Sequence, residues 1–473
     1  MFKHRTSGIL ITALIVIFYF WINPVHLNEQ QLMVSAVAIW MISLWVLELL
    51  PLPVVAFFPL IFFPSASILS WDELAKAYSN NMIFLFFGGF LISLAIEKWN
   101  LHKRIALSII RVTGTSGNQI LLGFLISTAS ISMWLSNTAT TMMMYPMAVA
   151  VIQMMQQTKL SQQSMQNFSL SLMIILAYAS NFGGLATVIG TPPNLAFNSF
   201  LQSKTGNAIS FFDWMLICTP LSVVILTFLY FLLTKFLYPN HIHSSETIKN
   251  YIKNEIHQLG KTQTSEKRVL IVFVTTAMMW IFKDLLNKIA PFKIEDAWIA
   301  LMGGLSLFMI KSQDNKTLLD WEDTKEMSWG ILFLFGGGIA LANALEKVGI
   351  LQMIGQQMLS FSSLGPTMIL LIIILISIFL SEVMSNIAQV IVLAPIIAGV
   401  AESLSLSIVQ LGLAMTLAAS CASMLPMGTP PNAIVYSSGK IPLSSMLKTG
   451  LIMNIICVIL IFVFCYYFLP LVL

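Results

Sequence analysis

The chain has 473 residues, of which 57% are hydrophobic and only 9% are charged, and its formal net charge is +4. Soluble globular proteins carry about 25% charged residues, so this chain cannot form a water-facing surface of ordinary size. The composition excludes a soluble protein, and the small net charge requires no acidic partner such as a nucleic acid.

Apolar stretches long enough to cross a bilayer recur along the chain, and about 20 such residues span the hydrocarbon core as a helix. In chain order, examples are residues 7–23, 32–48, 81–96, 211–234, 269–286, 329–345 and 443–469. These stretches are continuous, whereas the strands of a membrane barrel alternate apolar and polar residues over about ten positions. The sequence therefore predicts an all-α polytopic membrane protein, with the first stretch retained as a span because no cleavage pattern follows it.

Lysine and arginine are concentrated in three places, namely the amino terminus, the segment after residue 97 and the polar loop before residue 269. Cytoplasmic loops carry an excess of these residues, so we expect a multi-pass protein of the cell inner (plasma) membrane with a cytoplasmic N-terminus. The residues concerned are Lys3, Arg5, Lys98, Lys103, Arg104, Arg111, Lys235, Lys249, Lys253, Lys261, Lys267 and Arg268.

The sequence also repeats itself, because a series of blocks recurs in the same order in its two halves. The first-half blocks are Trp71-Asp72-Glu73, Phe87-Gly88-Gly89, Glu97-Lys98, Ser132-x-x-x-Ser136-Asn137 and Gly190-Thr191-Pro192-Pro193-Asn194. Their second-half counterparts are Trp321-Glu322-Asp323, Phe335-Gly336-Gly337, Glu346-Lys347, Ser381-x-x-x-Ser385-Asn386 and Gly428-Thr429-Pro430-Pro431-Asn432. A duplicated structural unit is the simplest explanation.

We divide the chain into an N-terminal span and lead-in (1–31), a first repeat (32–237), a cytoplasmic linker (238–268) and a second repeat (269–473). Each repeat has five crossings if one segment in it is a re-entrant hairpin, and these segments are residues 119–153 and 363–402. An odd count inverts the second repeat relative to the first, as in many secondary transporters. Reading each of these segments as two spans would leave the parity unchanged.

The Gly-Thr-Pro-Pro-Asn blocks predict broken helices. A residue before proline is driven out of the helical region, whereas proline is well placed in the first turn of a helix. We expect the chain to unwind around Gly190–Pro192, to restart near Pro193, and to do the same at Thr429-Pro430-Pro431. Such backbone is tolerated at membrane depth only inside protein or beside a water-filled cavity.

The Ser-Asn pairs are expected at the two hairpin tips, because serine and asparagine suit turns and helix caps. Free carbonyls, hydroxyls and asparagine oxygens suit a small hard cation, whereas helix N-termini suit an anion. A single Ser-Asn pair usually makes an interhelical hydrogen bond and a single Pro-Pro a kink. The duplication in register favours a binding site in the middle of the bilayer.

Other classes are disfavoured. An intramembrane enzyme would need an activated nucleophile or a metal at membrane depth, and all six histidines are expected in termini or loops. A channel would use rings of one residue type rather than broken helices. The four cysteines have no metal-ligand spacing, so no cofactor is expected. Glu48 and Glu382 are the candidate buried charges, either structural carboxylates or attractors of a cation.

With these motifs and Trp45-x-x-Glu48-x-x-Pro51, the chain resembles the divalent anion/sodium symporters, which include the INDY-type bacterial dicarboxylate transporters. The resemblance implies about eleven transmembrane helices plus two re-entrant hairpins, divided between a scaffold domain and a transport domain that moves like an elevator. It also implies a homodimer and sodium-coupled symport of succinate, malate, fumarate or possibly a tricarboxylate such as citrate. Some relatives are sodium-independent exchangers.

Carried over by residue, the resemblance implies two sodium sites and a shared substrate site. The sodium ligands would be Ser132, Ser136, Asn137 and Gly190 in one half, and Ser381, Met384, Asn386 and Gly428 in the other. The substrate carboxylates would meet Asn137, Thr138, Thr191, Asn386, Thr429 and Pro430. The second tip departs from the family's Ser-Asn-Thr, because Ile387 follows Asn386 and cannot donate a hydrogen bond.

Overall fold

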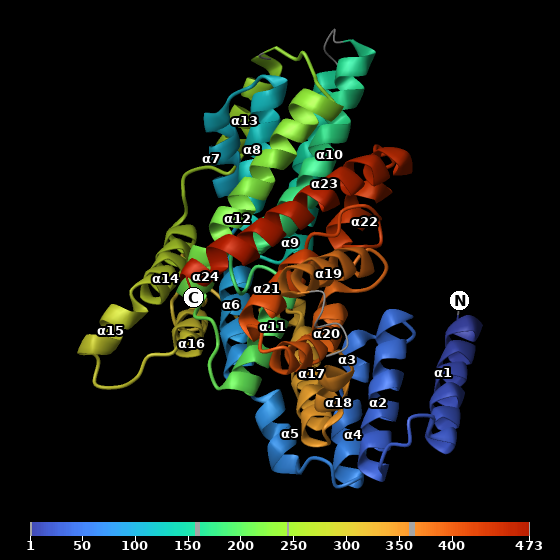
Figure 1. Ribbon diagram of the computed structural model, residues 1–473. Coiled ribbons are helices and arrows are strands. Elements are labelled where there is room, and N and C mark those ends of the chain that lie inside the picture. The colour runs from blue at the N-terminus through green and yellow to red at the C-terminus, as the bar shows by residue number, and fades with distance from the viewer. Residues whose placement is uncertain (1, 157–160, 244–245, 359–364, 473) are drawn as a thin grey trace.

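The computed structural model describes residues 2–156, 161–243, 246–358 and 365–472, and the regular secondary structure within these ranges is helical apart from one isolated β-bridge (Figure 1). The described residues contain seven helices long and apolar enough to cross a membrane, or eight if α14 and α15, bent by 76°, count as one span. This confirms an all-helical membrane protein. Residues 1, 157–160, 244–245, 359–364 and 473, all within the predicted segments, lie outside the described ranges.

The elements of the first half run from the amino terminus to a π-helical end after α12. They are α1 (Phe2–Ile22), α2 (Glu29–Val46), α3 (Leu52–Val55), α4 (Phe58–Ser65), α5 (Trp71–Tyr78), α6 (Asn81–Lys98), α7 (Leu101–Thr113), α8 (Gly117–Ser132), α9 (Asn137–Gln156), α10 (Gln162–Gly184), α11 (Pro192–Thr205), α12 (Phe211–Phe231) and the π-helix Leu232–Leu237.

The second half follows the same order after one additional helix. Its elements are α13 (Glu246–Gln258), α14 (Thr264–Ile281), α15 (Lys283–Ile289), α16 (Asp296–Ser306), the 3-10 helix Trp321–Glu326, α17 (Trp329–Lys347), α18 (Ile350–Met358), α19 (Gly365–Leu380), α20 (Asn386–Ser403), α21 (Ile408–Ala419), α22 (Pro430–Ser437), α23 (Leu443–Val463), the π-helix Phe464–Phe468 and α24 (Leu469–Val472).

The expected helix breaks are present. Helix α11 begins at Pro192 and α22 at Pro430, each preceded by a threonine with extended backbone (φ −142° and −143°). The unwinding begins earlier than expected, since α10 already ends at Gly184. The reason is Asn194, whose side-chain nitrogen donates to the carbonyls of Gly184 (3.1 Å) and Thr187 (2.9 Å) and so replaces the helical partners that these groups lose.

The predicted linker 238–268 is not a continuous polar loop, because it contains α13. Its place on the cytoplasmic side stays a prediction. His102 is likewise not in a loop, since it is buried in α7, where burial lowers its pKa. Ion pairs join α7 to this region, with Lys103 Nζ 3.2 Å from Glu255 and Arg104 Nε 2.6 Å from Glu266. Helices α7 and α13 are amphipathic, so a search of the sequence for long apolar stretches does not find them.

The two halves exchange contacts through their repeated blocks. Lys98 at the end of α6 lies 2.6 Å from Asp323, and Lys347 at the end of α17 lies 2.7 Å from Glu73. Each lysine therefore pairs with the acidic block of the other half. These blocks are structural, since they hold the two halves together at one end of α6 and of α17.

The Phe-Gly-Gly blocks make a second exchanged contact. A Cβ on Gly88 would lie 2.3 Å from the carbonyl carbon of Ala300 in α16, and one on Gly337 would lie 2.4 Å from the carbonyl oxygen of Ala56 after α3. Only glycine permits so close an approach of two backbones. The glycines of each half thus pack against a short helix of the other.

Candidate functional site

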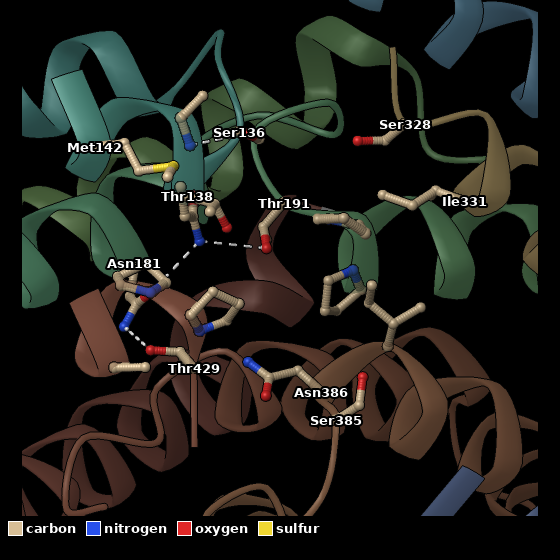
Figure 2. Close-up of a pocket in the computed structure, with 18 of the residues that line it drawn as sticks. Ser136, Thr138, Met142, Asn181, Thr191, Ser328, Ile331, Ser385, Asn386 and Thr429 are labelled. Atoms are coloured by element: carbon tan, nitrogen blue, oxygen red, sulfur yellow. Dashed lines mark hydrogen bonds between the residues drawn. The ribbon is translucent and has the colours of Figure 1, made fainter. Parts of the chain in front are cut away.

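One cavity of about 960 Å³ lies between the two Ser-Asn tips and the two helix breaks (Figure 2). All six predicted substrate residues line it, together with Ser136, Ile387 and Gly428. Four predicted sodium ligands do not line the cavity and are buried in the protein. These are Ser132, Gly190, Ser381 and Met384.

Four helices begin at this cavity, because Asn137, Pro192, Asn386 and Pro430 are the first residues of α9, α11, α20 and α22 and all line it. The N-terminal turn of a helix carries free N–H groups and about half a positive elementary charge. Four such ends around one cavity attract an anion, and proline at the start of two of them fixes where the helix begins.

The first Ser-Asn tip forms a cluster of oxygens behind the cavity. Ser132 Oγ lies 2.8 Å from the side-chain oxygen of Asn137 and 2.7 Å from the Ser180 carbonyl oxygen. The same Asn137 oxygen lies 3.1 Å from the Ser180 carbonyl and 3.2 Å from the Gly190 carbonyl. With the amide turned over, the Asn137 nitrogen would instead donate to all three of these oxygens. With the oxygen inward, the cluster consists of uncharged oxygens at a spacing that suits a hard cation, and a bound cation would favour that orientation.

Gly184 makes room for this cluster. A Cβ at that position would fall 2.4 Å from the Asn137 side-chain oxygen and 3.2 Å from the Gly190 carbonyl oxygen. The end of α10 is therefore bare where the oxygens gather. Neither Gly184 nor the Ser180 carbonyl was predicted, because a backbone carbonyl leaves no trace in residue type.

The second Ser-Asn tip repeats the arrangement. Ser381 Oγ lies 2.9 Å from the side-chain oxygen of Asn386 and 2.6 Å from the Ala419 carbonyl oxygen. Ala419 takes the place that Ser180 has in the first half. The predicted ligand Met384 is buried next to this tip in the sequence.

The two candidate buried charges differ in the structure. Glu382 is buried, and its carboxylate accepts hydrogen bonds from the backbone N–H groups of Ser423, Met424 and Leu425 (2.8–2.9 Å) and from Asn454 (2.7 Å). This contact set favours the structural alternative, since the carboxylate fixes the non-helical segment before α22. Glu48 is not buried: it is exposed in the turn after α2 and lines the cavity.

The described residues that line the cavity carry mostly negative formal charge. Glu48, Glu97, Glu326 and Asp323 line it, and Lys98, the basic residue among the described lining residues, is paired with Asp323. Among the described lining residues, the helix N-termini are therefore the positive groups that remain available to an anion in the cavity.

Sequence reasoning missed Asn181, which lines the cavity from the last turns of α10 and is 1% exposed. Its side-chain nitrogen donates to Thr429 Oγ1 (3.0 Å) and its oxygen accepts from Asn137 (3.5 Å), so it touches both halves of the site (Figure 2). The signal was available, since Ser180-Asn181 is a further Ser-Asn pair inside an apolar segment.

An all-helical membrane fold with two similar oxygen clusters beside one cavity defines a secondary transporter rather than an enzyme. The chain belongs to the family described as the sodium:sulfate symporter transmembrane region, whose model matches residues 3–473.

Relatives agree with this assignment. The chain is 35% identical over 459 residues to the sodium-dependent dicarboxylate transporter SdcS of Staphylococcus saprophyticus, covering 95% of this chain and 88% of that protein. It is 36% identical over 477 residues to SdcS of Staphylococcus aureus, covering 98% and 91%. The crystal structure of the Alcanivorax borkumensis YdaH transporter has the same fold, with a TM-score of 0.60 at 12% identity, and covers 94% of this chain and 100% of that one. The resemblance found in the motifs is confirmed.

Proposed function

We propose that this protein is a secondary active transporter that couples sodium entry to uptake of a dicarboxylate such as succinate, malate or fumarate. The observation that carries the proposal is the position of two oxygen clusters directly behind a cavity at which four helices begin. A cation site and an anion site thus share Asn137 and Asn386. The names of the SdcS relatives support sodium and a dicarboxylate as the ligands.

In this proposal, sodium in the first cluster is held by Ser132, Asn137 and Gly190, with Ser136 beside them, and the Ser180 carbonyl joins the set. Sodium in the second is held by Ser381, Asn386 and Gly428, with Met384, and the Ala419 carbonyl joins that set. Because both clusters adjoin the cavity, each bound ion lowers the electrostatic cost of placing a carboxylate there. Sodium and substrate therefore favour each other's binding, as coupled transport requires.

The substrate carboxylates would be bound by donors from both halves. Asn137, Thr138 and Thr191 supply one side, and Asn386, Thr429 and the helix end at Pro430 supply the other. The side-chain hydroxyls and amides are neutral, so the substrate is held without a permanent ion pair. Binding of this kind releases readily once sodium leaves.

We also propose two inverted repeats, residues 32–237 and 269–473, preceded by a span in 1–31 and joined by the linker 238–268. The exchanged contacts support this division, because Lys98–Asp323 and Lys347–Glu73 relate the same blocks in opposite directions. Eleven spans with hairpins at α8–α9 and α19–α20, an elevator-type transport domain, a homodimer and a cytoplasmic N-terminus in the plasma membrane complete the proposal. They follow from the family resemblance and the loop charges.

Thermal stability measured against a ligand panel tests this proposal, because a ligand that binds the native state raises the apparent melting temperature. We expect sodium to raise it relative to choline, and succinate to raise it further only when sodium is present. Stabilisation by sulfate but by none of the dicarboxylates would assign the site to an inorganic divalent anion instead.

Ile387 should set substrate preference, because it lines the cavity where the first half has Thr138. Ile387→Thr adds a hydroxyl donor to the second tip. A hydrogen bond to a charged group contributes about 1.5–3 kcal/mol, so we expect about ten- to a hundredfold tighter binding of those di- or tricarboxylates whose second carboxylate reaches α20. Competition assays with a carboxylate series measure this, and an unchanged ranking and affinity would show that Ile387 does not face the substrate.

A further inference from the structure

Asn181 is the polar side chain through which the first oxygen cluster touches the second helix break. Its nitrogen donates to Thr429 Oγ1 at 3.0 Å and to the Asn432 side-chain oxygen at 3.4 Å, and its own oxygen accepts from Asn137 Nδ2 at 3.5 Å. Among the described residues, the second half has no equivalent link. The position after the matching carbonyl is Ser420, whose buried hydroxyl has no hydrogen-bond partner among the described residues.

The hydroxyl of Thr429 is committed as an acceptor. Besides the hydrogen bond from Asn181, it accepts one from the backbone N–H of Asn432 at 3.3 Å, where it caps α22. A hydroxyl has two acceptor lone pairs and one hydrogen. With both lone pairs used, its hydrogen is free to donate into the cavity that Thr429 lines, and a substrate carboxylate there is the acceptor that it suits.

The amide of Asn137 has two competing orientations. In one orientation its oxygen faces the Ser132 hydroxyl and the carbonyls of Ser180 and Gly190, as a cation in the cluster would require. Turned over, its nitrogen would donate to the same three oxygens, which is the arrangement that satisfies the protein alone. Sodium in the cluster would therefore favour the first orientation, whereas the protein's own hydrogen bonds favour the second.

Turning the Asn137 amide has a consequence at Asn181. The Asn137 oxygen would then face the Asn181 oxygen, and two acceptors repel unless one of the amides turns as well. If the Asn181 amide turns, it gives up its 3.4 Å hydrogen bond to the Asn432 side-chain oxygen, and its own oxygen faces Thr429. The Thr429 hydroxyl then donates to Asn181 instead of to the cavity. Turning the Asn137 amide thus turns the Asn181 amide, and turning the Asn181 amide redirects the Thr429 hydroxyl hydrogen.

We propose that Asn181 is a positioning residue that transmits the sodium-dependent orientation of the Asn137 amide to the Thr429 hydroxyl, so that sodium in the first half makes a substrate donor available in the second. This inference rests on the proposed function, since it assigns a route for the coupling of sodium to dicarboxylate. It also explains why a link between the halves is built on one side only.

The test is the succinate dissociation constant of the purified full-length protein at low and at saturating sodium, together with the sodium dissociation constant without succinate. In Asn181→Ala we expect succinate binding at saturating sodium to weaken about tenfold, which is the value of roughly one charge-assisted hydrogen bond. Sodium affinity without succinate should change less than about threefold, because Asn181 is not a sodium ligand. Asn181→Ser, too short to reach both partners, should behave in the same way and serves if the alanine variant does not fold.

Two controls separate transmission from mechanical support. Tyr178 lies one turn earlier on the same face of α10, and its hydroxyl donates to the Ser423 carbonyl of the same non-helical segment. Tyr178→Phe removes that tie without touching the amides, so it should lower thermal stability but keep the sodium dependence of succinate binding. Ser420→Ala should leave both the thermal stability and the sodium dependence of succinate binding unchanged.

A double-variant cycle gives the most specific result. If Asn181 acts through Thr429, adding Asn181→Ala to Thr429→Val should weaken succinate binding little beyond Thr429→Val alone. Wild-type sodium dependence in Asn181→Ala, an equal loss in Tyr178→Phe, or additive losses in the double variant would each overturn the inference. A wild-type protein without sodium-dependent succinate binding would refute the proposed function as well.

Discussion

Gly184→Ala is expected to abolish sodium-dependent transport while leaving a folded protein. The added Cβ would lie 2.4 Å from the Asn137 side-chain oxygen, so the carboxamide must leave the first oxygen cluster. Because that oxygen ends a short side chain at the edge of a cavity, its displacement costs little stability. Losing one ligand oxygen for a cation costs about 1.5–3 kcal/mol, so sodium affinity should fall about ten- to a hundredfold.

Two other glycines provide matched comparisons for Gly184→Ala. In Gly183→Ala the Cβ would fall 2.5 Å from the Ala129 carbonyl oxygen in the backbone of α8, so a folding defect is expected there. In Gly8→Ala the Cβ meets only the flexible Leu49 side chain, 2.8 Å from Cδ2, and transport should be near normal. Sodium-dependent uptake and size-exclusion profiles of the three variants decide the matter. Normal sodium affinity in a well-folded Gly184→Ala variant would show that sodium does not bind in this cluster.

Asn137→Ala and Asn386→Ala are each expected to abolish transport, because each removes a group that serves both a cation and the anion. Both side chains line the cavity and also contribute an oxygen to a buried cluster. A folded protein is expected, since each residue begins a helix at the cavity rather than filling the core. Exposed Asn207→Ala, away from these tips, is the control for asparagine loss.

Asn137→Asp separates the two roles. The aspartate keeps an oxygen in the cluster but has no nitrogen to donate toward Asn181 and Thr191, and it adds negative charge beside the substrate. Sodium stabilisation in a thermal-shift assay should therefore persist, whereas succinate stabilisation should be lost. Near-normal transport by Asn137→Ala or Asn386→Ala would refute the site assignment.

Much of the site could be predicted because proline and glycine act locally. Pro192 and Pro430 fix where helices begin whatever surrounds them, and the Ser-Asn pairs mark the turns that precede the other two helices. Repetition of both features then indicated that they act together. The substrate residues that the family resemblance implied all line the cavity, but other lining residues, Asn181 among them, were not predicted.

The parts that could not be predicted depend on partners distant in the sequence. Every residue has a backbone carbonyl, so the sequence does not single out those of Ser180 and Ala419. The early end of α10 depends on the Asn194 side chain. The exchange of Lys98 and Lys347 between the acidic blocks is a tertiary pairing that a repeat alone does not reveal. Helices α7 and α13 were missed because each is amphipathic and is stabilised by packing one face against the protein. Neither contains a long apolar stretch that would mark it in the sequence.

The most direct test of sodium-coupled dicarboxylate transport is uptake of labelled succinate into proteoliposomes containing the purified protein under an inward sodium gradient. We predict that succinate accumulates, that unlabelled malate and fumarate compete with it, and that accumulation disappears when choline replaces sodium. Uptake that persists in choline and instead requires a dicarboxylate inside the vesicles would contradict symport and identify an exchanger.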